Sequence, residues 1–129
     1  MTDYQHIVSA AIEKLGLSAE KCQNALNLWK INRGSITLLI ELFEADNRVY
    51  FKVEALIAQL VNEQSTDFYK QLLLHNHSFN GFSFNLHEEA IYIKAVRDAF
   101  GMDINEAFVL ITKVGNHADK FDDEIQALI

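Results

Sequence analysis

The stretch that decides the fold is SITLLIELFEADNRVYFKVEALI, which spans residues 35–57. Apolar side chains alternate along residues 35–44, and they alternate again along residues 49–57. This period of two is typical of β-strands, since successive side chains of a strand point to opposite faces. The polar residues 45–48 separate the two runs. The pattern therefore predicts two antiparallel strands joined by a tight turn.

Further strands are predicted on both sides of this hairpin. Residues 26–31 alternate in the same way and end at Asn32-Arg33-Gly34, which predicts a three-stranded meander up to residue 57. Later in the chain, residues 82–86 and 91–95 alternate around a turn at residues 87–89. We expect these residues to form a second hairpin.

The opening segment has a helical period instead. Its apolar residues recur at the spacing that places them on one helical stripe: Tyr4, Ile7, Val8, Ala11, Ile12 and Leu15. We expect Thr2 or Asp3 to cap this helix and Gly16 to end it in a left-handed turn.

Two more helices complete the predicted order of elements. One extends from about Thr66 to His75, and the longest follows Asp103, which forms a variant of the capping box with Glu106. The apolar stripe of this last helix continues to Leu128. The order α-βββ-α-ββ-α predicts an α+β fold, an antiparallel sheet with helices mostly on one face.

Composition limits the domain organisation and the partners. The 129 residues, with no proline and no internal repeat, fit a single domain spanning residues 1–129. With 18 acidic and 11 basic side chains, the formal charge is −7. This balance disfavours nucleic acid and anionic membranes, because both attract Lys- and Arg-rich surfaces.

The sequence also favours a cytoplasmic location. Its single cysteine, Cys22, has no partner for an internal disulfide, and we interpret it as a small half-buried thiol. No apolar run approaches the roughly 18 residues that a membrane span needs. No basic flank followed by an apolar stretch opens the chain, so no secretion signal is predicted.

Signals for catalysis are weak. There is no glycine-rich phosphate loop and no nucleophile elbow. The neighbouring Glu88 and Glu89 would point apart in a turn, and no apolar pocket is evident that would separate their pKa values. We therefore assign no catalytic residue, and the chain is not expected to be an enzyme.

A metal site is the other chemical alternative. His75 and His77 are one residue apart, a spacing that can chelate from a strand. They fall, however, at the end of a predicted helix, where a histidine also complements the helix dipole. Since no third ligand is evident, we predict no metal and no cofactor.

The unusual feature is that several elements are apolar on two sides. Trp29, Leu39 and Phe43 lie on strands whose opposite face is also apolar. Either this second face is an interface, or the loops or the second helix of the same chain cover it. The second helix has the same character, since its apolar residues cover more than one stripe: Phe68, Tyr69, Leu72, Leu73 and Leu74. Such a helix needs two partners, such as the sheet and another subunit.

The whole pattern resembles the class I chaperones of bacterial type III secretion, the family of the Tir chaperone. The amphipathic helix from Tyr4 to Leu15 is one point of similarity, and the long closing helix from Ile104 to Leu128 is another. The third is the segment FYKQLLLHN, residues 68–76, followed by the strands at GFSFNL, residues 81–86, and at IYI, residues 91–93. The family similarly passes from a leucine-rich helix ending near an Asn into a hairpin.

The resemblance implies a function and a set of contacts. It implies a cytoplasmic homodimer that binds the N-terminal segment of a secreted effector and keeps this segment extended and export-competent. By position, the dimer contacts would be Phe68, Leu72 and Leu73. The client contacts expected on the opening helix and the sheet are Ile7, Ile12, Trp29, Leu39 and Phe43.

Some features depart from the family or leave alternatives open. Ile7 and Ile12 are also needed for the core stripe of their helix. The turn at residues 87–89 is short, and residues 53–61 are apolar enough to extend a strand or to begin a helix. The same order of elements would also suit a small bacterial regulator or adaptor with no secreted client.

Overall fold

The predicted central hairpin lies in the middle of the sheet. The computed structural model describes all residues 1–129, and in it β3 (Ile36–Ala45) pairs antiparallel with β4 (Arg48–Gln59). Asp46 and Asn47 form the turn, with φ values of 53° and 61°. Positive φ at both positions gives a turn whose twist matches that of the flanking strands, so this prediction is confirmed.

Four further strands complete a six-stranded antiparallel sheet of order β1-β2-β3-β4-β6-β5. They are β1 (Gln23–Ala25), β2 (Leu28–Arg33), β5 (Ser83–His87) and β6 (Ala90–Asp98). The second predicted hairpin is thus formed by β5 and β6, and it joins the first through the β4–β6 pairing.

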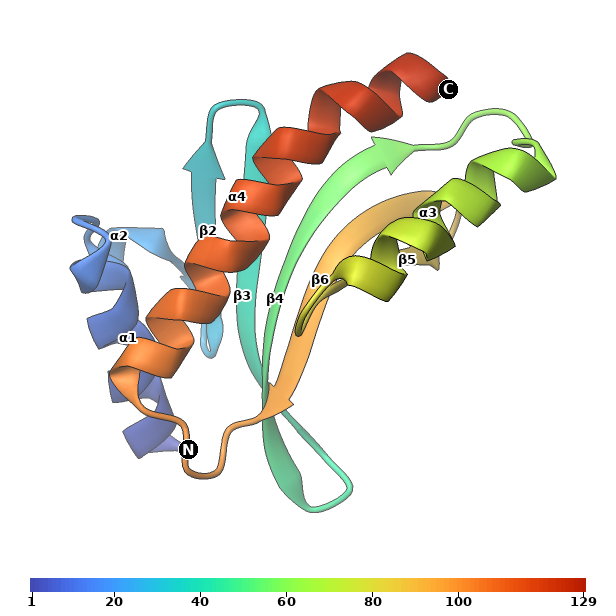
Figure 1. The fold of residues 1–129 in the computed structure, drawn as a ribbon. Helices are drawn as coiled ribbons and strands as arrows, with labels where there is room; N and C mark the ends of the chain where they lie inside the picture. Colours follow the sequence, from blue (N-terminus) through green and yellow to red (C-terminus); the bar gives the residue numbers. More distant parts are fainter.

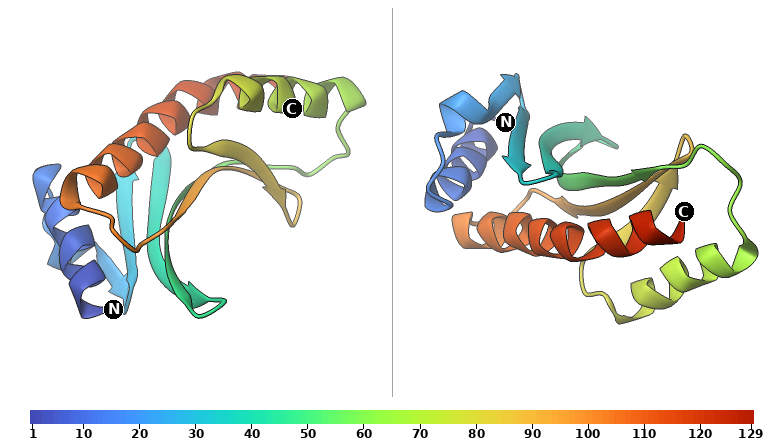
Figure 2. Two further views of the ribbon diagram at one scale, coloured as in Figure 1. Left: turned by 60° about the horizontal axis from the view of Figure 1, so that its bottom comes forward. Right: turned by 90° about the horizontal axis from the view of Figure 1, so that it is seen from above.

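The helices lie on one face of this sheet. They are α1 (Thr2–Lys14), α2 (Ala19–Cys22), α3 (Thr66–Ser78) and α4 (Ile104–Leu128). The long α4 crosses β3, β4 and β6, α1 packs beside α4, and α3 lies against β5 (Figures 1 and 2). The α+β fold and the order α-βββ-α-ββ-α are confirmed, with the short α2 and β1 as additions.

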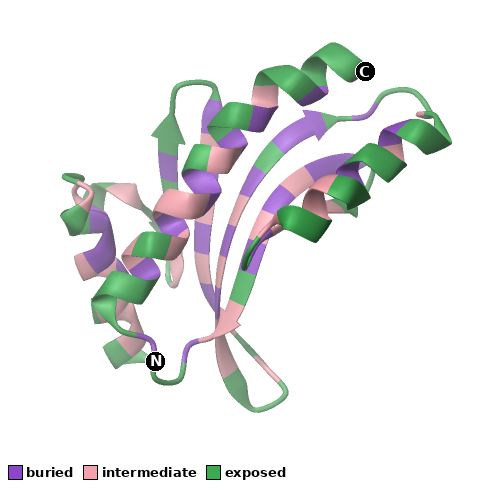
Figure 3. Ribbon diagram, viewed as in Figure 1, coloured by how far each residue is buried: buried purple, intermediate pink, exposed green.

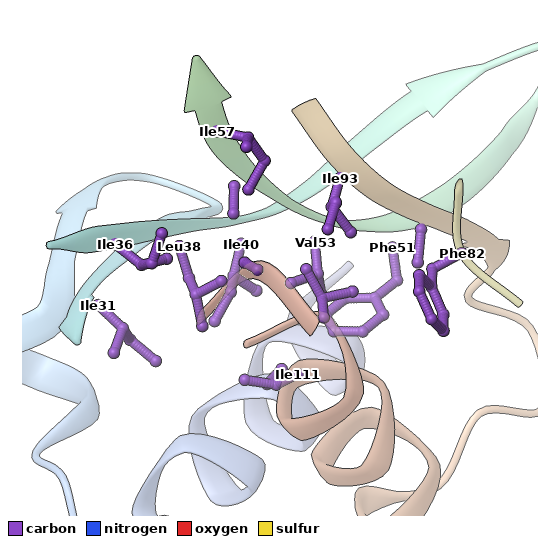
Figure 4. Close-up of a cluster of buried hydrophobic side chains, with 14 of the residues drawn as sticks. Ile31, Ile36, Leu38, Ile40, Phe51, Val53, Ile57, Phe82, Ile93 and Ile111 are labelled. Carbon is purple, nitrogen blue, oxygen red and sulfur yellow. The ribbon is translucent and has the colours of Figure 1, made fainter. Parts of the chain in front are cut away.

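The core lies between α4 and the sheet. Figure 4 shows Leu38, Ile40 and Val53 extending from β3 and β4 toward Ile111 of α4. All four are at most 3% exposed, and no polar or charged residue is buried. The buried residues follow every second position of the strands and one stripe of α4 (Figure 3). The predicted periods of 2 and 3.6 therefore describe the core directly.

The ends of the helices agree with most of the local signals. Asp103 and Glu106 form a complete capping box at the start of α4, as predicted. Gly16 adopts φ +85° after α1, also as predicted. The predicted cap at Thr2 or Asp3 is wrong, because both residues are already helical and Met1 occupies the cap position without a side-chain hydrogen bond.

Strand and helix boundaries differ in places from the sequence prediction, and one open alternative is decided. The strand expected at residues 26–31 begins at Leu28, because Leu26 and Asn27 form the turn between β1 and β2, with Asn27 at φ 64°. Of the apolar residues 53–61, those up to Gln59 extend β4, so the strand alternative is confirmed and no helix begins there. α3 continues to Ser78, one turn beyond the predicted end. None of the helices is both long and apolar enough to span a membrane.

Two ion pairs lie near the end of β6, one to α4 and one to β4. Arg97 Nη1 lies 2.9 Å from Glu106 Oε2, and Arg48 Nη1 lies 2.6 Å from Asp98 Oδ2. The hydrogen bond from Arg97, together with that from the Asp103 backbone, lowers the carboxyl pKa of Glu106. The backbone N–H of Phe100 and the guanidinium of Arg48 lower the carboxyl pKa of Asp98. Both carboxylates are therefore stabilised in their charged form.

These pKa shifts predict a loss of stability in acid. Since both carboxyl pKa values are lower in the folded chain, the contribution is complete above the unfolded values of about 3.9 for Asp and about 4.3 for Glu. It is lost as the pH falls through the folded values. We expect the urea midpoint to fall between neutral pH and about pH 3.

The control for this measurement is the double variant Asp98→Asn with Glu106→Gln. Its urea midpoint should fall less over the same pH range, because two of the titrating groups are absent. An equal fall in the variant and the wild type would show that other carboxyl groups account for the acid sensitivity.

Candidate peptide-binding surface

The sheet face away from the helices has no covering element (Figure 2). The strand register places its residues in rows that cross the sheet. One row contains Lys30, Leu39, Glu54 and Lys94, and the next contains Leu28, Glu41, Lys52 and Val96. Apolar and charged side chains are thus mixed across this face. We call it the open face.

The predicted contact Phe43 lies on the open face. It is half-buried, and its ring stacks on that of Tyr50 across the β3–β4 pair, with 5.6 Å between ring centroids. Lys52 Nζ lies 5.6 Å from the centroid of the Phe43 ring. Cross-strand aromatic pairs of this kind present a rigid apolar surface, on which an apolar side chain of a partner can pack.

Leu39 also lies on the open face, among charged neighbours. It stands between Lys30 and Glu54 in its row and is half-buried. Beside this row, Lys52 Nζ lies 3.1 Å from Glu41 and 3.7 Å from Glu54. A partner that packs on Leu39 therefore also meets charges of both signs, which suits an amphipathic segment better than a wholly apolar one.

Three other predicted contacts lie on the opposite side of the sheet. Trp29 is 1% exposed and Ile12 is 0% exposed, so both side chains belong to the core beneath the helices. Trp29 lies two residues before Ile31 on β2, so both side chains point to the same face, and Ile31 is also buried. Ile7 is half-buried on α1 and packs against the core cluster. Only Leu39 and Phe43 of the five therefore share one accessible face.

One edge of the sheet is only partly paired. The short β1 pairs with Leu28 and Trp29 of β2, and no strand pairs with the outer side of residues 30–33. An unpaired strand edge can accept an extended peptide as an added strand. The order of elements predicted that edge strands would be available, but not β1 or which residues stay unpaired, since the length of β1 depends on where the chain turns at Asn27.

Helix α3 has two different sides. Phe68 and Leu72 are 6% and 7% exposed and pack into the core, whereas Leu73 and Leu74 are 67% and 64% exposed. The prediction that this helix is apolar on more than one side is confirmed. Of the three residues expected at a dimer interface, only Leu73 is free to contact a second molecule. Leu74 is equally free, and Figure 3 shows how much of α3 is exposed.

Asn76 fixes α3 to the edge of the sheet. Its side-chain carbonyl accepts a hydrogen bond from the backbone N–H of Phe84 at 2.7 Å, and its amide donates to the Phe84 carbonyl at 3.2 Å. The side chain thus pairs with β5 as a neighbouring strand would. Because of this pairing, α3 and its exposed leucines have a defined position relative to the sheet.

An aromatic cluster joins α3 to α4. The His75 ring lies 4.9 Å from the Phe121 ring, and the His117 ring lies 4.3 Å from the Phe82 ring, centroid to centroid. Phe79 contacts both sides of the cluster. His75 therefore packs among aromatic rings, while His77 is exposed. No group of three or more His, Cys, Asp or Glu side chains is arranged to hold a metal ion.

The other residues considered for catalysis lie in a turn and beside the core. Glu88 and Glu89 form the turn between β5 and β6, with φ values of 49° and 60°. Cys22 is a free, half-buried thiol, as predicted. The molecule thus offers an open face, a free strand edge and an apolar helix side, all of which are features suited to binding polypeptide.

Comparison with solved structures identifies the fold. A chain of the ExsC–ExsE complex matches with a TM-score of 0.68 at 12% identity, over 95% of this chain and 92% of that chain. SycH, a type III secretion chaperone of Yersinia pestis in complex with a stable fragment of YscM2, matches with a TM-score of 0.64 at 11% identity, over 91% and 98% of the two chains.

A third match is a chain of the heterodimeric ExoU–SpcU complex from the type III secretion system of Pseudomonas aeruginosa. Its TM-score is 0.61 at 14% identity, over 89% of this chain and 94% of that chain. No family model matches the sequence, and no curated protein is significantly similar to it. The chain thus has the fold of type III secretion chaperones.

Asn76→Ala should weaken the attachment of α3. The variant leaves the backbone N–H and C=O of Phe84 without partners in a part-buried place, which costs about 1–3 kcal/mol. The free energy of unfolding from urea titration measures this loss. Asn80→Ala is the control, because Asn80 is exposed, and it should change stability by less than about 0.5 kcal/mol. Equal effects of the two substitutions would contradict the role of Asn76.

Proposed function

We propose that this protein is a cytoplasmic bacterial chaperone of type III secretion. It binds the N-terminal segment of a secreted effector and keeps this segment extended and competent for export. The protein acts by binding and not by catalysis, and it needs no cofactor or metal. Nucleic acid and membranes are not its partners, in keeping with the formal charge of −7.

The observation that carries this proposal is the one-sided construction of the chain. The long α4 covers one face of the sheet and α3 lies along β5, so the open face has no covering element and no strand pairs with the outer side of residues 30–33. An extended polypeptide satisfies both, since its backbone can pair with the strand edge while its side chains pack on the sheet. The fold, shared with chains of type III secretion complexes, supports the identity of the partner.

The same proposal includes a homodimer formed through α3. Leu73 and Leu74 are the exposed apolar residues of this helix, and Phe68 and Leu72 support them from the core. In an interface with two-fold symmetry, α3 of one subunit would face α3 of the other. The dimer would then present two open faces to one client.

Leu73→Glu is expected to convert the dimer into a folded monomer. Its side chain is 67% exposed in one chain, so the charge is tolerated there but is buried without a partner at the interface. Light scattering measures the mass in solution, and circular dichroism measures the fold. Gln71→Glu adds the same charge to an exposed position of α3 and is the control.

Leu72→Glu separates the interface from the core. Leu72 is 7% exposed within one chain, so this variant should lose the fold rather than only the dimer. A wild-type monomer, or a Leu73→Glu variant that stays dimeric, would refute the α3 interface.

Phe43→Asp is expected to preserve the fold and to weaken client binding. The half-buried ring lies on the open face, and the new carboxylate would lie near Lys52, which limits the cost of the charge. The client is first recovered from the native cell lysate and identified by mass spectrometry. Its affinity for the wild type and for the Phe43→Asp variant is then measured by titration. We expect the variant to bind the client about tenfold more weakly, or weaker still.

Phe100→Asp is the matched control, because Phe100 is 77% exposed in the turn before α4 and lies outside the sheet. Its affinity for the client should equal that of the wild type. A folded Phe43→Asp variant that retains full affinity would remove the open face from the client path. A clean dimer that recovers no secreted partner would instead favour the regulator or adaptor function.

A further inference from the structure

Two hollows adjoin each other along the free edge of β2. The first has a volume of about 300 Å³ and lies between the end of α1, β2, β3 and α4. The second, of about 350 Å³, lies between α2 and β2. They share Leu17, Ile31 and Asn32, so they form one continuous groove past residues 30–33. We call it the edge groove.

The edge groove has an apolar floor. Leu15 and Leu17 come from the end of α1 and the turn after it, Ile31 and Leu38 come from the sheet, and Ile111 comes from α4. Leu17 is 38% exposed, which is high for an apolar side chain placed beside the core. An aliphatic side chain of a ligand would cover it and would contact the other four.

The charges of the edge groove are all of one sign. Lys21, Lys30 and Arg33 line it, and no Asp or Glu does. None of the three cations takes part in an ion pair, whereas Arg48, Lys52 and Arg97 each contact a carboxylate. In a chain with 18 acidic and 11 basic residues, a groove with three free cations and no anion stands out. It complements an acidic ligand.

Two polar groups of the edge groove lie at α4. The Arg33 guanidinium rests on α4 at Gly115, where a Cβ would lie only 3.1 Å from its Nη1. Glycine thus lets the cation lie close to the helix backbone. The hydroxyl of Thr112, which also lines the groove, is buried and has no hydrogen-bond partner within the chain.

We propose that the edge groove is a subsite selective for an acidic, extended segment of the client. The added strand would pair with residues 30–33, place an aliphatic side chain in the hollow beside Ile31, and direct carboxylates to Lys30 and Arg33. This inference rests on the proposed function for the identity of the ligand as a client segment. The acidic preference rests on the charges of the groove.

Strand geometry converts this placement into a sequence pattern. In an antiparallel pair, residues directly opposite each other lie on the same face of the sheet. The N-terminal position of the added strand lies opposite Arg33 and is acidic, and the next lies opposite Asn32 and is unrestricted. The third position lies opposite Ile31 and is aliphatic, and the fourth lies opposite Lys30 and is acidic. Lys21 on α2 adds a positive charge near the acidic position opposite Lys30.

Three synthetic peptides test the pattern with the full-length protein. They share a neutral frame and differ in the central four residues: Glu-Thr-Ile-Glu, Gln-Thr-Ile-Gln or Lys-Thr-Ile-Lys. Backbone amide shifts in NMR spectra, recorded up to millimolar peptide, report both the affinity and the site. We expect the Glu peptide to shift residues 30–33 and Leu17, and to bind more tightly than the Gln peptide. The Lys peptide should not bind there.

Arg33→Gln should lower the affinity for the Glu peptide about fivefold and leave the affinity for the Gln peptide unchanged. Added salt should reduce the same difference between the two peptides. Lys120→Gln is the control, because Lys120 is an exposed cation on α4 that does not line the groove. Equal affinities for the Glu and Gln peptides, shifts confined to other residues, or no shifts at all would overturn the proposal.

Capture of the client separates this proposal from the proposed function. If Arg33→Gln recovers the secreted client as well as the wild type does, and the Glu peptide shows no preference, the chaperone function stands and the acidic subsite is wrong. If the peptides behave as expected but no secreted client is recovered, the subsite stands and the chaperone function is wrong.

Discussion

The packing of α4 against the apolar side of β3 and β4 is the interaction on which the rest of the structure depends. The core has no buried polar or charged residue, so its cohesion comes from apolar burial rather than from specific polar contacts. A single long helix covers the centre of the sheet, and its capping box fixes where it begins. The other helices attach at the margins of this layer: α1 beside α4, and α3 at the far edge of the sheet.

Covering only one side of the sheet has consequences for the other side. The residues of the open face are mixed, with the Phe43–Tyr50 stack next to the ion pairs of Lys52. Such a face can remain in contact with water and still offer apolar contacts to a partner. The two edges of the sheet also differ. At one edge the Asn76 side chain forms hydrogen bonds with the backbone of β5. At the other edge the short β1 leaves residues 30–33 unpaired. An extended ligand can thus pair with the edge of β2 and pack on the open face.

The extent to which the sequence predicted the site follows from this geometry. The sequence placed Leu39 and Phe43 opposite the core face because strand alternation separates the two faces of β3, and it marked Leu73 because α3 has more apolar residues than one stripe can hold. Trp29 and Ile12 lie in the core, because which face of β2 and of α1 meets the helices depends on packing, which the apolar pattern alone does not specify. The cations of the edge groove come from two elements, Lys21 from α2 and Lys30 and Arg33 from β2, and only the fold places them along one groove.

The sequence by itself determined the local structure: the periods of strands and helices, the turns at Asp46-Asn47 and Gly16, and the capping box of α4. These features depend on residues close together in the chain, whose conformational preferences are the same in any fold. The tertiary structure alone decided which apolar face is buried, how far β1 protects the edge of β2, and where Arg33 meets Gly115. These are contacts between different elements, and their outcome depends on how the strands and helices pack together.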